Sequence, residues 1–174
     1  MSALDVPIRI RRLDERDSLE TLTALLHRAY AELAALGFRY KAVNQGVDVT
    51  RARISNGECY VAVSGLEIVA TALLLPPSWR PAHCEFYARP EVAVLSQFAV
   101  EPRLQRHGLG SRLISRLEER AAELGAEELS IDTAEGATHL VALYERRGYR
   151  RVGTEQWEHA NYRSVLLSKP LVQR

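Results

Sequence analysis

Cysteines, long apolar runs and an excess of charge of one sign are scarce or missing in this sequence. Cys59 and Cys84 are its two cysteines, and they stand in separate segments without the spacing of a disulfide scaffold or a zinc site. We therefore expect reduced thiols and no bound metal. The formal net charge is +1, which removes the main electrostatic reason to expect nucleic acid or an acidic membrane as partner.

Hydropathy and length set the class of protein. No apolar stretch reaches the roughly 18 residues that a membrane span needs, and Met1–Pro7 lacks the basic region and apolar run of a signal peptide. These observations predict a cytoplasmic protein that does not associate with membranes. With 174 residues, 47% of them apolar and 26% charged, the chain suits a single globular domain over residues 1–174.

Lysine is also nearly absent, since all but two of the 23 basic residues are arginine. A cluster of arginines therefore carries little information by itself. The group Arg146, Arg147, Arg150 and Arg151 leaves nucleic-acid binding open as an alternative, although such a group is more often a solvated face. We expect no nucleic-acid partner.

The spacing of apolar residues switches between the period of strands and that of helices. The predicted strands cover residues 8–11, 59–63, 68–75, 92–100, 129–132, 149–157 and 162–168, the predicted helices cover 19–36, 49–54, 109–124 and 137–147, and a loop covers 38–50. This order predicts an α+β (mixed α/β) fold: a central mixed, mostly antiparallel sheet of about six or seven strands, flanked by about four helices.

The segment that follows the strand over 92–100 has the composition of an anion site. Gly108 and Gly110 open the next helix, and the first amides of a helix have no acceptor within it. Glycine also lets a ligand approach the backbone closely. Four side chains add charge around this turn: Arg103, Arg106, His107 and Arg112.

Two glycines alone are a weak motif, because they also serve a plain strand-to-helix connection. A P-loop is disfavoured, since no lysine lies near Gly108 or Gly110. A dinucleotide fingerprint would need a small residue three positions after Gly110, where this chain has Leu113.

The stretch Gln105-Arg106-His107-Gly108-Leu109-Gly110 resembles the Gln/Arg-x-x-Gly-x-Gly/Ala signature of the GCN5-related N-acetyltransferase (GNAT) superfamily. Downstream, Leu143-Tyr144-Glu145-Arg146-Arg147-Gly148-Tyr149 is similar to that family's Leu-Tyr-Glu-x-x-Gly-Phe/Tyr segment. The resemblance implies acetyl-CoA as co-substrate. It implies that the main chain of Phe98, Ala99 and Val100 contacts the pantetheine arm, and that the pyrophosphate is held by Gln105, Arg106, His107, Gly108, Leu109, Gly110 and Ser111.

The resemblance also assigns Tyr144 as the acid that protonates the departing thiolate. A phenol suits this role, because its ordinary pKa of about 10 keeps it protonated at neutral pH. On spacing alone Tyr144 reads as a core aromatic, since it shares a helical face with Leu140. The flanking motif favours the catalytic interpretation.

Two features of the family's pattern are missing. The strand over 92–97 has no acid to act as a base, and Glu91, His83, Glu85 and His159 are further candidates that also read as plain surface residues. Many relatives carry Asn seven residues before the Tyr, where this chain has Ala137; Thr133 or Thr138 are possible substitutes.

Aromatic residues gather in the segments that would line the acceptor site. They are Phe38, Tyr40, Trp79, Phe86 and Tyr87, with Arg39 and His83 among them. A satellite cluster under a long loop is the alternative. The sequence thus predicts an N-acetyltransferase acting on an amine of a small molecule or peptide, with a catalytically silent acyl-CoA sensor or interaction module as the second hypothesis. The last strand pair is a candidate contact for a homodimer.

Overall fold

The computed structural model describes residues 7–172. The segment Met1–Val6, most of the stretch used for the localisation prediction, lies outside these residues. Within residues 7–172, no helix combines the length and apolarity required to cross a membrane.

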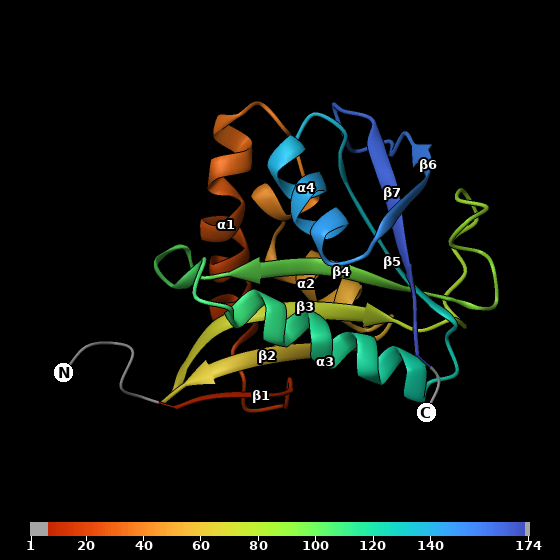
Figure 1. Cartoon of the computed structure of the whole chain (residues 1–174). Coiled ribbons are helices and arrows are strands. Elements are labelled where there is room, and N and C mark those ends of the chain that lie inside the picture. Colours follow the sequence, from red (N-terminus) through yellow and green to blue (C-terminus); the bar gives the residue numbers. More distant parts are fainter. Residues whose placement is uncertain (1–6, 173–174) are drawn as a thin grey trace.

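The described chain forms one seven-stranded sheet and four α-helices, which confirms the predicted fold class (Figure 1). The elements are β1 (Ile8–Arg12), α1 (Leu19–Ala35), α2 (Val47–Ile54), β2 (Glu58–Ser64), β3 (Glu67–Leu75), β4 (Val92–Val100), α3 (Leu109–Glu123), β5 (Glu128–Ala134), α4 (Thr138–Arg146), β6 (Arg150–Glu155) and β7 (Ser164–Pro170), with 3-10 turns at Lys41–Val43 and Pro102–Leu104. The loop predicted over 38–50 contains the first 3-10 turn, and it ends earlier than expected, because α2 begins at Val47, directly after Gly46.

The sheet has the order β1-β2-β3-β4-β5-β7-β6. All neighbours are antiparallel except β4 and β5, which run parallel and pair only from Val92–Val94 to Glu128–Ser130. Beyond these three pairs the two strands diverge, so that β5, β7 and β6 stand at an angle to β1–β4 (Figure 1). The divergence leaves the second half of β4 without a partner on that edge.

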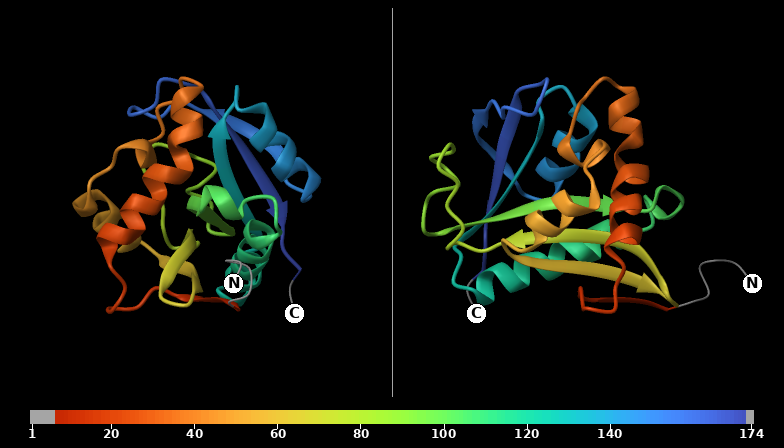
Figure 2. Two further views of the ribbon diagram at one scale, coloured as in Figure 1. Left: turned by 90° about the vertical axis from the view of Figure 1, so that its left-hand side faces the viewer. Right: turned by 180° about the vertical axis from the view of Figure 1, so that it is seen from behind.

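Helices cover both faces of the sheet (Figure 2). On one face, α3 buries Leu113, Ile114 and Leu117 in the largest apolar cluster, which also includes Val141 and Tyr144 of α4. On the other face, α1 packs its leucines against β2–β4, in a cluster that reaches the loop before β4. Burial of these side chains, at about 1.5–3 kcal/mol each, is the main force that holds the two halves of the sheet together.

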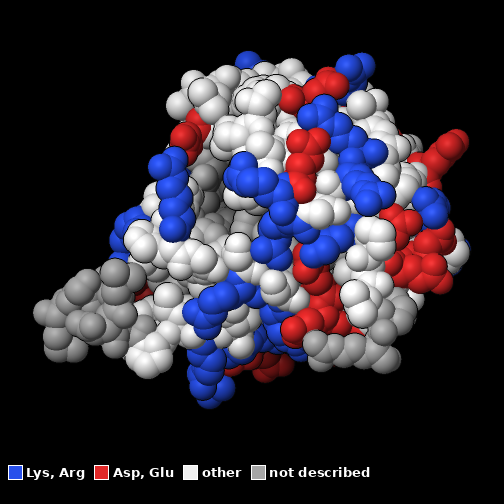
Figure 3. Space-filling model, viewed as in Figure 1, with Lys and Arg blue, Asp and Glu red and all other residues white. Residues whose placement is uncertain are grey.

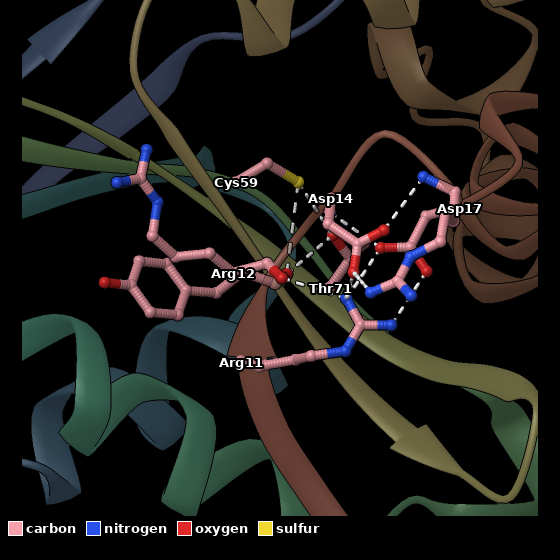
Figure 4. A network of polar contacts seen from close by, with 8 residues as sticks. Arg11, Arg12, Asp14, Asp17, Cys59 and Thr71 are labelled. Atoms are coloured by element: carbon pink, nitrogen blue, oxygen red, sulfur yellow. Dashed lines mark hydrogen bonds and ion pairs between the residues drawn. The ribbon is translucent and has the colours of Figure 1, made fainter.

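A polar network fixes the connection between β1 and α1 (Figure 4). The Arg11 guanidinium donates to both carboxylate oxygens of Asp17 at 2.6 and 2.8 Å, and Asp17 also accepts the Asp14 amide at 2.8 Å. Nearby, Cys59 is buried and its Sγ lies 3.5 Å from Thr71 Oγ1. Both cysteines are free, as expected from the sequence, and burial raises the pKa of the Cys59 thiol to about 11.

The last strand pair lies at one end of the sheet, with β6 as its exposed edge. The predicted homodimer contact at this pair stays a prediction. Two of the four arginines in the cluster around β6 have carboxylate partners, because Arg147 lies 3.5 Å from Glu118 and Arg151 lies 2.8 Å from Glu145.

Candidate active site

A bulge shapes the unpaired half of β4. The register against β3 shifts between Thr71 and Leu73, and Gln97 opposite this point has a positive φ of 47°. After the bulge, the Glu101 amide donates to Val69 of β3 at 2.8 Å. Since main-chain groups alternate along a strand, those of Phe98 and Val100 face the other edge, where β5 has moved away.

The turn after β4 presents unbonded amides at the start of α3. Gly108 is the N-cap with a φ of 81°, and the first amide that bonds back is Arg112, to the Gly108 carbonyl at 3.0 Å. The amides of Leu109, Gly110 and Ser111 therefore have no acceptor within the helix. No side chain caps them and no acidic residue stands in the first turn. The macrodipole adds partial positive charge, so this turn can bind an anion.

Glycine is favoured at positions 108 and 110 of the turn for different physical reasons. A Cβ on Gly108 would meet nothing within 4 Å, so this residue is required by its positive φ and leaves open space before the amides. A Cβ on Gly110 would lie 3.0 Å from Phe98 Cζ. Gly110 thus lets α3 pack against β4, a reason for this glycine that the sequence analysis did not give, and close approach of a ligand to Gly110 stays a prediction.

Side chains of the turn hold it against the end of β4. Gln105 Nε2 donates to the Val100 carbonyl at 3.1 Å, and His107 Nδ1 lies 2.7 Å from the Gln105 carbonyl oxygen. Arg103 instead forms an ion pair with Glu67 at 2.7 Å, away from the turn's amides. Arg106 is exposed and borders the cleft described next.

A cleft of about 680 Å³ opens where β4 and β5 diverge. Figure 3 shows this face of the molecule hollowed between α1 and α4, with basic side chains at the margin. Of the residues predicted to bind the cofactor, those that line the cleft are Phe98, Ala99, Val100, Gln105, Arg106, Gly108, Gly110 and Ser111. His107 and Leu109 do not line it, and the Leu109 side chain is buried in the core, which leaves only its amide for a ligand. Contact of these residues with a cofactor stays a prediction.

Tyr144 of α4 lines the same cleft. Its side chain is only 4% exposed and packs edge-on against Tyr149. Among the described residues no side chain or main-chain group hydrogen bonds to its hydroxyl. Burial raises the pKa of Tyr144 well above the ordinary value, so its proton stays bound at neutral pH.

The expected aromatic wall is only partly present. Tyr40, Trp79 and Tyr87 line the cleft, whereas Phe38, Arg39, His83 and Phe86 do not. Phe38 packs in a small cluster with Leu33, as the alternative of a satellite cluster described. Three aromatic residues that the sequence did not single out as acceptor residues also line the cleft: Tyr30, Trp157 and Tyr162.

Of the candidate bases and the candidate substitutes for the family's Asn, two line the cleft: His159 and Thr133. His159 lines the cleft, and burial lowers its pKa, as do the charges of Lys41 and Arg53. Glu91, His83 and Glu85 do not line the cleft. Thr133 lines it too, with its Oγ1 2.8 Å from the Tyr40 hydroxyl, whereas Thr138 does not.

The sequence analysis did not single out Asp132, whose carboxylate belongs to a residue that lines the cleft. Its oxygens accept the Tyr87 hydroxyl at 3.0 Å, Trp157 Nε1 at 2.9 Å and the Ser164 hydroxyl at 3.1 Å. The sequence did contain a signal for it, because Asp132 is the last residue of the predicted strand over 129–132, the first strand after the anion turn and its helix.

It also missed Arg53, a partly buried cation of α2 that lines the cleft. Its guanidinium donates to Gln45 Oε1 at 2.7 Å and to Ser96 Oγ at 3.0 Å. Because arginine is common throughout this chain, an arginine on a short helix did not indicate a binding site in the sequence.

Known proteins resemble this chain in sequence and in fold. A family model described as the acetyltransferase (GNAT) family matches residues 20–149. The chain is 33% identical over 150 residues to the S-(2-succino)cysteine N-acetyltransferase of Bacillus subtilis (strain 168). This match covers 84% of this chain and 87% of that protein.

The solved structures that share the fold include one with acetyl-CoA and one with CoA. One is a GNAT family acetyltransferase from Elizabethkingia anophelis with acetyl-CoA bound, with a TM-score of 0.69, 19% identity, and coverage of 94% of this chain and 98% of that one. The other is a Bacillus subtilis acetyltransferase in complex with CoA, with a TM-score of 0.67, 23% identity, and coverage of 95% and 100%. The hypothesis of a catalytically silent sensor finds no support in these matches. The chain belongs to the GNAT family of acetyltransferases.

Proposed function

We propose that this acetyltransferase moves the acetyl group of acetyl-CoA to an amine of a small molecule or peptide. The observation that carries the proposal is the meeting of three features in one cleft. They are the free amides at the start of α3, the unpaired edge of β4 and the Tyr144 hydroxyl. Each matches a different part of the donor.

The residues present fit acetyl-CoA. A diphosphate would be held by the amides of Leu109, Gly110 and Ser111, for which Gly108 leaves open space. A pantetheine arm carries amide groups, and the outward main chain of Phe98 and Val100 offers them partners that β5 does not take. When bound, acetyl-CoA supplies an acetyl group activated as a thioester.

Around the reacting atoms, this chain supplies a donor of hydrogen bonds and a donor of protons. A main-chain amide on the open edge of β4, near Phe98, would donate to the acetyl oxygen as negative charge develops there. The Tyr144 hydroxyl would give its proton to the departing sulfur. His159 lines the cleft with a lowered pKa and is therefore mainly uncharged at neutral pH, a state in which it can accept a proton.

The acceptor would enter at the end of the cleft lined by Trp79, Tyr87 and Trp157. A pocket walled by aromatic rings with a few polar groups suits a small organic amine. The curated relative named above is an N-acetyltransferase of S-(2-succino)cysteine, which supports a small amine for this chain as well.

Two measurements test the proposal: calorimetric titration with acetyl-CoA, and release of free thiol in the presence of a panel of amines. We expect saturable binding and thiol release that depends on the amine. Acetyl-pantetheine, which lacks the diphosphate, is the matched control and should bind far more weakly, because the α3 amides then have nothing to hold. A folded protein without affinity for acetyl-CoA would contradict the proposal.

A further inference from the structure

The Arg53 guanidinium lines the cleft without an ion-pair partner among the described residues. It forms no ion pair with a carboxylate of residues 7–172, and its two hydrogen-bond acceptors there are both neutral, the Gln45 amide oxygen and the Ser96 hydroxyl. The other arginine that lines the cleft, Arg106, is exposed to solvent, whereas Arg53 is partly buried. Arg53 thus brings to the cleft a positive charge that no ion pair neutralises, although the charge of Asp132 raises the pKa of Arg53 from a distance.

Desolvating such a charge is unfavourable unless something pairs with it. Burial lowers the pKa of Arg53. Burial raises the pKa values of Tyr30 and Tyr162, which line the cleft, and the charge of Arg53 opposes that rise. At His159 burial lowers the pKa, and the charge of Arg53 lowers it further. The positive field therefore reaches across the cleft. A charge kept at this cost inside a ligand site is a signature of binding rather than of folding.

Two hydrogen bonds hold the guanidinium in a fixed orientation. The Gln45 side chain that accepts from Arg53 also donates to Gln97 Oε1 at 2.7 Å and to Thr50 Oγ1 at 2.8 Å, so it is itself immobile. Gln97 is the bulge residue of β4, directly before Phe98. A guanidinium has five N–H donors, and those not used here remain available in the fork geometry that matches a carboxylate.

The nearest acid in the cleft does not satisfy Arg53. Asp132 forms no ion pair with it, and the Asp132 oxygens are engaged by Tyr87, Trp157 and Ser164. The acceptor end of the cleft thus contains a cation and an anion that are held apart by other partners. This arrangement is complementary to a ligand that itself carries both a carboxylate and an amine.

We propose that Arg53 binds a carboxylate of the acetyl acceptor, and that the acceptor is an aminocarboxylate of the amino-acid type rather than a simple amine. This inference rests on the proposed function, because it names the acceptor for the same cleft. Arg53 is then the residue that sets specificity, and its carboxylate contact places the amine near the bulge of β4.

The test compares matched substrates in the thiol-release assay: a panel of amino acids, and the carboxamides of the same amino acids. The carboxamide keeps the shape and the amine but loses the charge. We expect kcat/KM of the wild-type protein to be about 100-fold higher for the best acid than for its amide, as for loss of a charged hydrogen-bonded pair. This comparison needs no variant, so it does not depend on folding of a mutant.

Variants then locate the effect. Arg53→Gln should lower kcat/KM for the acid by about 100-fold, mainly through KM, and leave the amide unchanged, whereas Arg53→Lys should recover part of the loss. Arg51→Gln is the control, since Arg51 lies on the same helix, is exposed and does not line the cleft. Affinity for acetyl-CoA should be the same in all of these proteins.

The outcomes separate the two proposals. Acetyl-CoA binding with equal turnover of acids and amides, or with turnover of no aminocarboxylate in the panel, overturns the role of Arg53 and leaves the cofactor assignment intact. A loss that is equal for acid and amide in Arg53→Gln overturns it as well. If acetyl-CoA does not bind, both proposals fail together.

Discussion

Tyr144 shows how a single residue can be a core aromatic and a candidate acid at once. The Tyr144 ring packs against Tyr149 in the main apolar cluster, and Tyr144 also lines the cleft. Burial of the ring is also what raises the pKa of its hydroxyl. The two interpretations drawn from the sequence therefore describe the two ends of one side chain.

Replacement Tyr144→Phe should lower kcat by about 10² to 10³, the range of a lost general acid, with little change in the affinity for acetyl-CoA. Because the pKa of Tyr144 lies well above 10, wild-type kcat should show no loss up to about pH 9 that comes from this residue. Steady-state kinetics over pH 6–9 measure both effects.

Tyr149→Phe is the matched control. The Tyr149 hydroxyl donates to Glu118 at 3.0 Å and does not line the cleft, so this change should cost about 1 kcal/mol of stability and leave kcat unchanged. Equal kcat for wild type and Tyr144→Phe would remove Tyr144 from the mechanism.

At the scale of elements, the start of α3 should respond to charge in opposite ways in folding and in binding. Ser111 lies in the first turn, where no acid is present. Ser111→Glu should stabilise the fold by up to about 1 kcal/mol through the helix dipole. The same carboxylate would repel a diphosphate, so we expect acetyl-CoA affinity to fall by about 10- to 100-fold.

Chemical denaturation and calorimetric titration measure these two effects, and Ser111→Gln provides the uncharged control of equal size. If Ser111→Glu bound acetyl-CoA as tightly as Ser111→Gln, the diphosphate would have to lie elsewhere.

The junction between β1 and α1 should make stability depend on acid. The hydrogen bonds from Arg11 hold the pKa of Asp17 below its ordinary value. A lowered pKa in the folded state contributes stability above the unfolded pKa of about 4, and this contribution disappears as pH falls through the lowered folded value.

Asp17→Asn should therefore cost about 1–2 kcal/mol at pH 7 and almost nothing at pH 2, as measured by urea denaturation at both values. Glu15→Gln, an exposed change in the same loop, should cost little at either pH. A loss for Asp17→Asn that persisted unchanged at pH 2 would show that the ion pair is not its source.

At the scale of the molecule, the cleft has walls from the whole chain: α1, β4, the start of α3, β5 and α4. Although β4 and β5 share only three residue pairs, the main apolar cluster extends across both halves of the sheet. We therefore expect one cooperative unfolding transition, coincident by circular dichroism and fluorescence. Acetyl-CoA at 100 times its Kd should raise the stability of this single unit by about 2.7 kcal/mol. Two transitions, of which acetyl-CoA shifts one, would instead indicate two units.

The sequence alone determined the elements and the local anion turn. The strand over 92–100 has the predicted bounds, and the helix that starts at Leu109 follows from glycines and leucines a few residues apart. Such features depend on neighbours in the chain, so the period of the apolar residues reports them directly. The predicted role of Gln105–Ser111 depends mainly on the backbone, so the sequence could predict their position before α3 as well.

Only the tertiary structure decided which side chains line the cleft. Arg53, Asp132 and Trp157 come from α2, β5 and the loop before β7, and the divergence of β4 from β5 brings them to one cleft. Periodicity shows that a face is polar but not which distant element lies opposite it. The same limit applies to Gly110, because its contact with Phe98 joins a helix to a strand. Long-range packing, which no local pattern encodes, thus set the charge and the shape of the cleft.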